Sequence, residues 1–198
     1  MRPSTERLRY EADETVDLAV LNRNRVFVID QVTAQHRLQA LSAVGASLPA
    51  HCTAIGKALL AGLTDEQVER LLPKRLPAET ANTITDRDEL LADLARVRVS
   101  RVAYDREELM IGILTFGAGI RDASGGVAEL SIPVPTARVV GQEERLAEML
   151  LRTCAEISAT QGANVVHNRS GFGLIAEYWN EVSHVVGPFS TRPARRVL

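Results

Sequence analysis

Residues 51–62 read HCTAIGKALLAG and predict a short helix that begins directly after an adjacent histidine and cysteine. Alanine and leucine residues recur at helical spacing through this stretch, and Gly62 is a residue type that commonly ends a helix. His51 and Cys52 leave three interpretations open: a nucleophile with its base, half of a metal site, or the rim of a binding pocket.

Catalysis and metal binding are the weaker interpretations of this pair. Adjacent residues seldom point their side chains at each other, and catalytic partners usually come from distant segments. His36, His167 and His184 show no metal-ligand spacing to the pair. We therefore predict no catalytic residue, no metal site and no cofactor. A thiolate at a helix N-terminus has a lowered pKa, so Cys52 as an enzyme nucleophile or a redox sensor stays an alternative.

The composition is that of a globular cytoplasmic protein. Of 198 residues, 45% are apolar and 24% are charged, which suits one domain with a sizeable core. The formal net charge of −2 argues against electrostatic binding of nucleic acid by the body of the chain. The two cysteines suit a reducing compartment, and the sequence holds no signal peptide and no apolar run of membrane-spanning length. We expect no membrane partner.

The N-terminal half alternates between strand and helix signals. Two apolar runs around Asn22-Arg23-Asn24 predict a β-hairpin, and residues 36–49 predict a third strand that Gly45 and Pro49 interrupt.

Two further helices carry clear N-terminal signals. Thr64 with Gln67 forms a capping-box pattern for a helix that ends at Pro73. Thr85 is the expected cap of the next helix, whose apolar positions have helical spacing. These positions are Leu90, Leu91, Leu94 and Val97.

The C-terminal half begins with a predicted hairpin of residues 110–120 and 127–134 around a turn at 122–126. One face of its second strand is apolar, and the other, with Glu129 and Ser131, is expected to face something polar. A strong amphipathic helix follows over residues 141–159, with Cys154 as a buried apolar position on its stripe. The order of these elements predicts an α+β fold with antiparallel strand pairs.

Three segments together resemble a known family. Residues 45–67 (GASLPAHCTAIGKALLAGLTDEQ), 102–112 (VAYDREELMIG) and 125–139 (GGVAELSIPVPTARV) resemble the effector-binding domain of IclR-type bacterial transcription regulators. The resemblance implies a GAF-like or profilin-like antiparallel sheet flanked by helices, with a pocket for a small organic acid or aromatic catabolite. It also implies a homodimer or homotetramer without enzymatic activity. A ligand-free dimerisation module is the other alternative.

The resemblance divides the chain into three parts. Residues 1–14 are expected to form a linker or helix, and residues 15–160 the effector-binding domain. Residues 161–198 are expected to be a C-terminal extension with a short amphipathic helix. In the family, a separate N-terminal winged helix-turn-helix domain contacts DNA. We therefore expect DNA binding only through such a domain, absent from or separate from this chain, and the sequence leaves open whether the chain is truncated.

The resemblance places the ligand carboxylate on the backbone amides of Ala54 and Ile55, with Gly56 permitting close approach. The first amides of a helix have no intrahelical acceptor and lie at the positive end of its dipole, so they suit an anion. A tightly packed helix would explain the small residues equally well. On this reading His51 orients the loop, and Cys52 fills space or touches the ligand.

Three side chains match ligand-contacting positions of the family: Asp105, Thr115 and Ser131. Glu107 and Glu108 beside Asp105 are expected to lie on a solvated loop.

Departures from the family pattern favour a larger or aromatic acid. Pro133 stands where many relatives have a second serine, and Phe116 with its aliphatic neighbours makes the pocket more apolar. Glu129 would repel an anion unless it is protonated or turned away.

Overall fold

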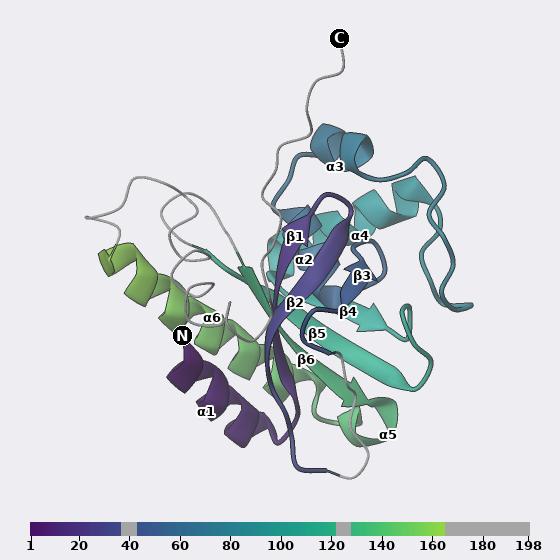
Figure 1. Cartoon of the computed structure of the whole chain (residues 1–198). Coiled ribbons are helices and arrows are strands. Elements are labelled where there is room, and N and C mark those ends of the chain that lie inside the picture. Colours follow the sequence, from purple (N-terminus) through teal and green to yellow (C-terminus); the bar gives the residue numbers. More distant parts are fainter. Residues whose placement is uncertain (37–42, 122–127, 165–198) are drawn as a thin grey trace.

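The computed structural model describes residues 1–36, 43–121 and 128–164 as a six-stranded sheet with helices on both faces (Figure 1). The sheet is antiparallel throughout, with the strand order β3-β2-β1-β6-β5-β4. The strands are β1 (Val16–Asn22), β2 (Arg25–Val32), β3 (Ser47–Pro49), β4 (Ala103–Arg106), β5 (Ile113–Ile120) and β6 (Ala128–Pro135). The predicted α+β class is therefore confirmed.

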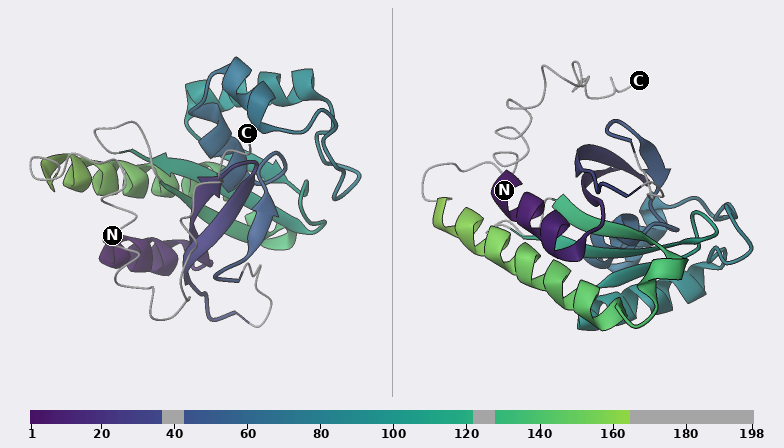
Figure 2. Two further views of the ribbon diagram at one scale, coloured as in Figure 1. Left: turned by 45° about the horizontal axis from the view of Figure 1, so that its top comes forward. Right: turned by 90° about the horizontal axis from the view of Figure 1, so that it is seen from below.

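Two layers of helices cover the sheet, and each encloses its own hydrophobic core (Figure 2). The helices are α1 (Arg2–Ala12), α2 (Ala54–Ala61), α3 (Asp65–Leu71), α4 (Arg87–Ser100), α5 (Thr136–Val139) and α6 (Glu143–Asn164). Helices α1 and α6 pack on one face, and α2 lies on the other with α4 behind it. Within the described residues, no helix is both long enough and apolar enough to cross a membrane.

Both predicted hairpins are present. Strands β1 and β2 pair from Val16 opposite Val32 to Asn22 opposite Arg25, and Arg23 in the turn has a positive φ of 57°. Strands β5 and β6 form the second hairpin, although its predicted turn at 122–126 lies outside the described residues. The short helix expected beyond residue 160 has its apolar positions outside them as well.

The third strand differs from its prediction. It follows Gly45 rather than preceding it, and it includes Pro49 at its end. Residues 37–42 of the predicted strand lie outside the described residues. Proline is tolerated because β3 is an edge strand, where a missing N–H need not break the ladder of a central sheet.

One of the two predicted helix caps is confirmed, and the other lies one residue further along the chain. Thr64 and Gln67 make both hydrogen bonds of the predicted capping box of α3. Helix α4 is capped by Asp86 rather than by Thr85, and the Asp86 carboxylate accepts from the Glu89 amide at 3.0 Å. Both residue types can cap a helix, so the choice depends on the residue at which the chain turns into it.

Strand β6 is enclosed on both faces, including the face that was expected to meet something polar. Every residue of β6 is buried, including Glu129 and Ser131. The face with Leu130 and Ile132 packs in the core under α6, as predicted, and α2 covers the opposite face. Polar side chains on this second face are therefore enclosed between the sheet and α2.

Candidate functional site

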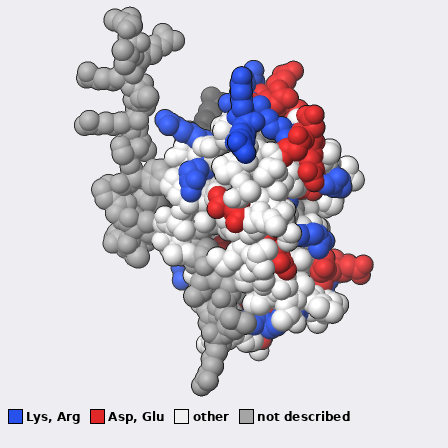
Figure 3. All heavy atoms as spheres, turned by 90° about the vertical axis from the view of Figure 1, so that its right-hand side faces the viewer, with Lys and Arg blue, Asp and Glu red and all other residues white. Residues whose placement is uncertain are grey.

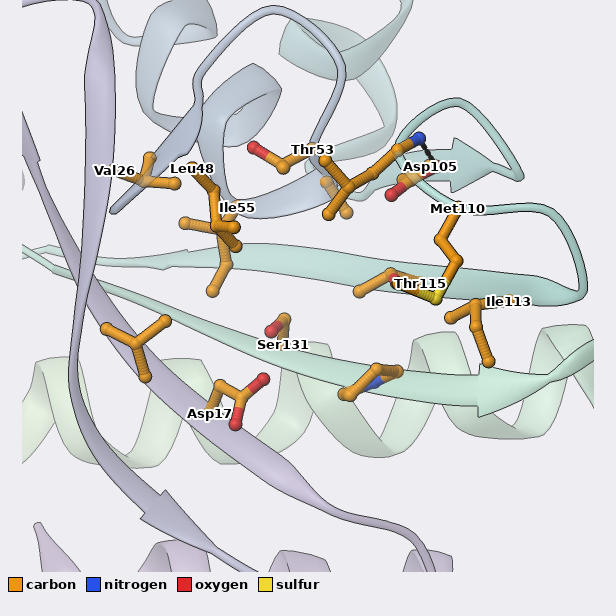
Figure 4. A pocket seen from close by; sticks show the side chains of 14 residues that line it. Asp17, Val26, Leu48, Thr53, Ile55, Asp105, Met110, Ile113, Thr115 and Ser131 are labelled. Carbon is orange, nitrogen blue, oxygen red and sulfur yellow. Dashed lines mark hydrogen bonds between the residues drawn. The ribbon is translucent and has the colours of Figure 1, made fainter. Parts of the chain in front are cut away.

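A cavity of about 330 Å³ lies between the N-terminus of α2 and the covered face of the sheet (Figure 4). Most of its wall is apolar, which suits a small organic ligand. The apolar lining residues are Val26, Val28, Leu48, Ala54, Ile55, Leu109, Met110, Ile113 and Pro133. The polar ones are Asp17, Thr53, Asp105, Thr115 and Ser131. No lysine, arginine or histidine lines the cavity within the described part of the chain.

The first turn of α2 supplies two backbone donors beside this cavity. Thr53 is the N-cap, and its hydroxyl accepts from the Gly56 amide at 3.1 Å. The Lys57 amide donates to the Thr53 carbonyl at 2.9 Å. The amides of Ala54 and Ile55 precede these bonds and have no acceptor among the described residues. They are therefore available to an anion at the positive end of the helix dipole.

Two glycines allow α2 to sit in this position. A Cβ atom at Gly117 of β5 would lie 2.6 Å from the Ala54 carbonyl carbon and 2.9 Å from the Ile55 nitrogen. A Cβ atom at Gly56 would lie 2.1 Å from the Ala50 carbonyl oxygen. Gly56 does not line the cavity, so here it permits close packing of α2 against the preceding loop.

The histidine and cysteine that precede α2 are both buried and lie outside the cavity lining. The His51 ring nitrogen Nε2 is 2.8 Å from the Pro77 carbonyl oxygen, and this hydrogen bond fixes the loop to the 73–84 segment. Burial raises the pKa of the Cys52 thiol to about 12, and the charge of Asp105 adds to the effect. The lowered pKa that the helix N-terminus suggested is therefore wrong: desolvation outweighs the helix dipole, and the thiol stays protonated.

Asp105 lies on β4 with its carboxylate at the cavity wall. Its oxygen Oδ1 accepts from the Glu108 amide at 2.7 Å and from the Leu109 amide at 3.2 Å. Burial raises the pKa of Asp105 to about 7, although these two backbone hydrogen bonds act in the opposite direction. Asp105 is therefore partly protonated near neutral pH, which lowers its repulsion of an anionic ligand.

Glu108 corrects the prediction of a solvated loop face. Its side chain is buried, and its oxygen Oε1 lies 2.5 Å from the Nζ of Lys57. Lys57 is buried as well, and its Nζ lies 2.9 Å from Oδ2 of Asp93 on α4. Glu107 is half-buried. The ion cluster of Lys57, Glu108 and Asp93 thus fixes the loop between β4 and β5 to α2 and α4. The sequence pattern did not reveal this cluster.

Thr115 and Ser131 line the cavity from β5 and β6, as Figure 4 shows. Glu129, predicted to repel an anion unless it is protonated or turned away, lines a second cavity of about 610 Å³ beside Gly119. Burial raises the pKa of Glu129 well above its usual range.

Asp17 is the charged cavity residue that sequence reasoning missed, and Thr53 and most of the apolar lining were not predicted either. Asp17 lies on β1 opposite Ser131, and its only signal was a charged residue inside an apolar run.

The site is suited to binding rather than to covalent chemistry. It combines two backbone donors, two buried carboxyl groups and the hydroxyl groups of Thr53, Thr115 and Ser131 around an apolar space. Within residues 1–36, 43–121 and 128–164, no group of three or more His, Cys, Asp or Glu side chains is placed to hold a metal ion. On the face shown in Figure 3, basic and acidic side chains lie side by side at the top of the view.

Comparisons with known proteins match the chain to one family. The family described as "Bacterial transcriptional regulator IclR C-terminal" matches residues 1–159. The HTH-type transcriptional regulator Rv1719 of Mycobacterium tuberculosis is 49% identical over 159 residues, which are 80% of this chain and 61% of that protein. The regulator TtgV of Pseudomonas putida is 34% identical over 82% of this chain and 62% of its own length. The chain thus spans about three fifths of the length of these relatives.

A solved structure shares the fold and contains a ligand. It is an IclR homologue of Microbacterium hydrocarbonoxydans complexed with 4-hydroxybenzoate. It matches with a TM-score of 0.75 and 26% identity over 82% of this chain and 66% of that one. The described residues therefore have the GAF-like fold of the C-terminal domains to which they are similar.

Proposed function

The chain belongs to the IclR family of bacterial transcriptional regulators, which are not enzymes, and we propose that its cavity binds a small organic acid as an effector. One observation carries the proposal: the amides of Ala54 and Ile55 open the first turn of α2 at the wall of a largely apolar cavity. A carboxylate is the ligand group that this pair of donors suits best.

The dimensions and lining of the cavity support a larger or aromatic acid over a very small one. Its volume of about 330 Å³ falls within the range of pockets that hold drug-sized organic molecules, which starts at about 300 Å³. Met110, Ile113 and Pro133 provide apolar contact area opposite α2. The relative crystallised with 4-hydroxybenzoate carries an acid of this type in the same fold.

Three side chains supply further hydrogen-bonding groups to the cavity. Asp105, with its raised pKa, offers either a donor or an acceptor, and Thr115 and Ser131 offer hydroxyl groups. Cys52 lies behind this surface and supports the packing of the loop rather than the contact with the ligand.

The effector acts by shifting a conformational equilibrium of the regulator. In this proposal the chain forms a homodimer or homotetramer in the cytoplasm. A helix-turn-helix domain, separate from the described residues, contacts DNA and responds to that equilibrium.

Thermal unfolding in the presence of a panel of aromatic and aliphatic carboxylates tests the proposal. A ligand at 100 times its dissociation constant should raise the free energy of unfolding by about 2.7 kcal/mol. Asp105→Ala and Ser131→Ala should reduce this shift, whereas Asp88→Ala, an exposed carboxyl on α4, should leave it unchanged. If no acid stabilises the protein, the ligand-free dimerisation module is the better description.

A further inference from the structure

The second cavity, of about 610 Å³, lies at the edge of the sheet beside β5. Strand β4 begins at Ala103, opposite Gly117, so residues 118–120 of β5 have β6 as their only neighbouring strand in the described part of the chain. Residues of α2 and α4 line this cavity on one side of the sheet, and residues of α6 line it on the other. We call it the edge cavity. Among the described residues, none lines both it and the effector cavity at the N-terminus of α2.

Glu129 brings a buried carboxyl group to the edge cavity. It lies on β6 opposite Gly119 of β5. A Cβ at Gly119 would be 2.9 Å from Oε1 of Glu129 and 3.8 Å from its Oε2. The carboxyl group therefore lies across Gly119, toward the edge of the sheet, and the absence of a side chain at position 119 leaves room for it there.

One oxygen of this carboxyl group lacks a partner. Glu129 is 4% exposed, and its Oε2 takes part in no hydrogen bond within the described residues. Buried polar atoms in native proteins nearly always have a partner, because leaving one without a partner costs free energy. A ligand that supplies a partner to Oε2 removes this cost, so the oxygen marks a contact point for a polar ligand group.

A hydroxyl group is the partner that Oε2 suits. Burial raises the pKa of Glu129 well above its usual range, and the nearby charge of Arg121 opposes only part of this rise. The carboxyl group therefore holds its proton near neutral pH. A hydroxyl group can both donate and accept, so it pairs with Oε2 whichever oxygen of the carboxyl group carries the proton.

Three arginines line the same cavity and favour a ligand with negative charge. Arg98 and Arg101 come from the C-terminal end of α4, and Arg121 directly follows β5. Arg98 is held in place, since its Nη2 lies 2.7 Å from Oδ1 of Asp65 and its Nε donates to the Ala61 carbonyl at 3.1 Å. Arg101 is exposed, and its side chain forms no hydrogen bond or ion pair with the residues that the structure describes.

We propose that the edge cavity is a second ligand site, for a small anion that also carries a hydroxyl group, such as a phosphorylated polyol. The phosphate contacts Arg101 beside the positive charge of Arg121, and a hydroxyl group contacts Oε2 of Glu129. The effector cavity has no basic side chain in its lining within the described residues, so a doubly charged phosphate is not expected there. The second site does not depend on the proposed acid-binding function.

Isothermal titration with three matched compounds tests the proposal: glycerol 3-phosphate, propyl phosphate and glycerol. Propyl phosphate keeps the charge and the carbon chain without the hydroxyl groups, and glycerol keeps the hydroxyl groups without the charge. For the unaltered chain we expect glycerol 3-phosphate to bind at least about tenfold more tightly than propyl phosphate, because a buried polar group disfavours an analogue that leaves it unpaired. Glycerol should not bind measurably.

Arg101→Gln tests the contact with the anion. It should weaken the binding of both phosphates about tenfold, because a charge-assisted hydrogen bond is lost. Arg70→Gln is the matched control and should leave both affinities unchanged, since Arg70 is an exposed arginine of α3 that does not line the edge cavity. Equal affinities of the two variants would show that the phosphate binds elsewhere, and the second site would be overturned.

Two variants at position 129 test the contact with the hydroxyl group. Glu129→Leu removes the polar group, so the preference for glycerol 3-phosphate over propyl phosphate should fall to about threefold or less. Glu129→Gln keeps a neutral group that donates and accepts, so the preference should stay at about tenfold. Each preference is a ratio within one variant, so a change in the folded fraction cancels, and a role in packing alone would not separate the two variants.

The remaining results decide the second site separately from the acid-binding function. The second site is overturned if glycerol 3-phosphate does not bind the unaltered chain or binds it without preference over propyl phosphate. It is also overturned if Glu129→Leu keeps the preference, or if Glu129→Gln loses it to the same extent as Glu129→Leu. Acid binding in the effector cavity is measured with carboxylates and with Ser131→Ala, so none of these results changes its standing.

Discussion

Lys57 Nζ lies 2.5 Å from Glu108 Oε1 in the interior behind the first turn of α2. This contact joins the helix that offers the amide donors to the β4–β5 loop, which carries Leu109 and Met110 to the cavity and whose amides donate to Asp105. Asp93 adds α4 to the same cluster. Two walls of the candidate site are therefore held by one buried cation.

Removing this cation should destabilise the protein strongly. Lys57→Met would leave the buried carboxylate of Glu108 without its counter-ion, whereas the half-buried Asp93 would keep its ion pair with Arg96 at 2.9 Å. Breaking a buried pair in this way typically costs about 3–5 kcal/mol. Chemical denaturation measures the loss. Lys74→Met is the matched control, because Lys74 is the only other lysine and is exposed. Equal stability of the two variants would show that the cluster contributes nothing to the fold.

The two glycines of β5 should differ in their tolerance of a methyl group. Gly117→Ala would force its Cβ against the backbone of Ala54 and Ile55, so we expect a loss of about 1–3 kcal/mol and weaker effector binding. Gly119→Ala would meet only the Glu129 carboxylate, which can move, and should cost less than about 1 kcal/mol. Thermal unfolding and ligand titration of both variants check this. If Gly119→Ala lowers stability more than Gly117→Ala does, the close approach of α2 is not the reason that position 117 requires glycine.

The features that follow local rules could be predicted from the sequence. The capping box of Thr64 and Gln67 needs only residues three positions apart, and the buried stripe of α6 follows from its 3.6-residue period. The two hairpins follow from apolar runs separated by turns. Asp105, Thr115 and Ser131 came from the family resemblance, and the structure brings all three to one cavity.

The features that depend on long-range contacts could not be predicted. Glu108 reads as part of an acidic loop until the fold brings it to Lys57, which is 51 residues earlier in the chain. Asp17 joins the site only because β1 pairs with β6 and places it opposite Ser131. Cys52 lies near a helix N-terminus, and its raised pKa depends on burial that the local sequence does not specify.

Both cysteines should resist modification in the folded protein. Cys52 is fully buried with a pKa of about 12, and burial also raises the pKa of the Cys154 thiol. Ellman's reagent at pH 8 should therefore react with neither thiol until the protein unfolds, and then with both. The time course before and after addition of guanidinium measures this. Rapid reaction of one thiol in the folded protein would support Cys52 as a redox sensor.

Asp105 should make both stability and effector binding depend on pH. Its pKa is raised from 3.8 to about 7 in the folded protein, so between these values the folded state holds a proton that the unfolded state has released. Stability therefore falls as pH rises from about 4 to 7 and changes little above, by at most roughly 4 kcal/mol for this group. The protonated form also accepts an anionic ligand more readily, so effector affinity should decline as pH rises through 7.

Asp105→Asn separates this contribution from those of other groups, since its amide oxygen can still accept from the Glu108 and Leu109 amides. Relative to the unaltered chain, the variant should become more stable as pH rises from 4 to 7, and the difference should then level off. Its effector affinity should vary less between pH 6 and 8, because no charge develops at position 105. Denaturation and calorimetric titration across this range give both curves. Parallel curves for the two proteins would mean that Asp105 ionises in the folded state as it does in water, and that its charge does not govern the site.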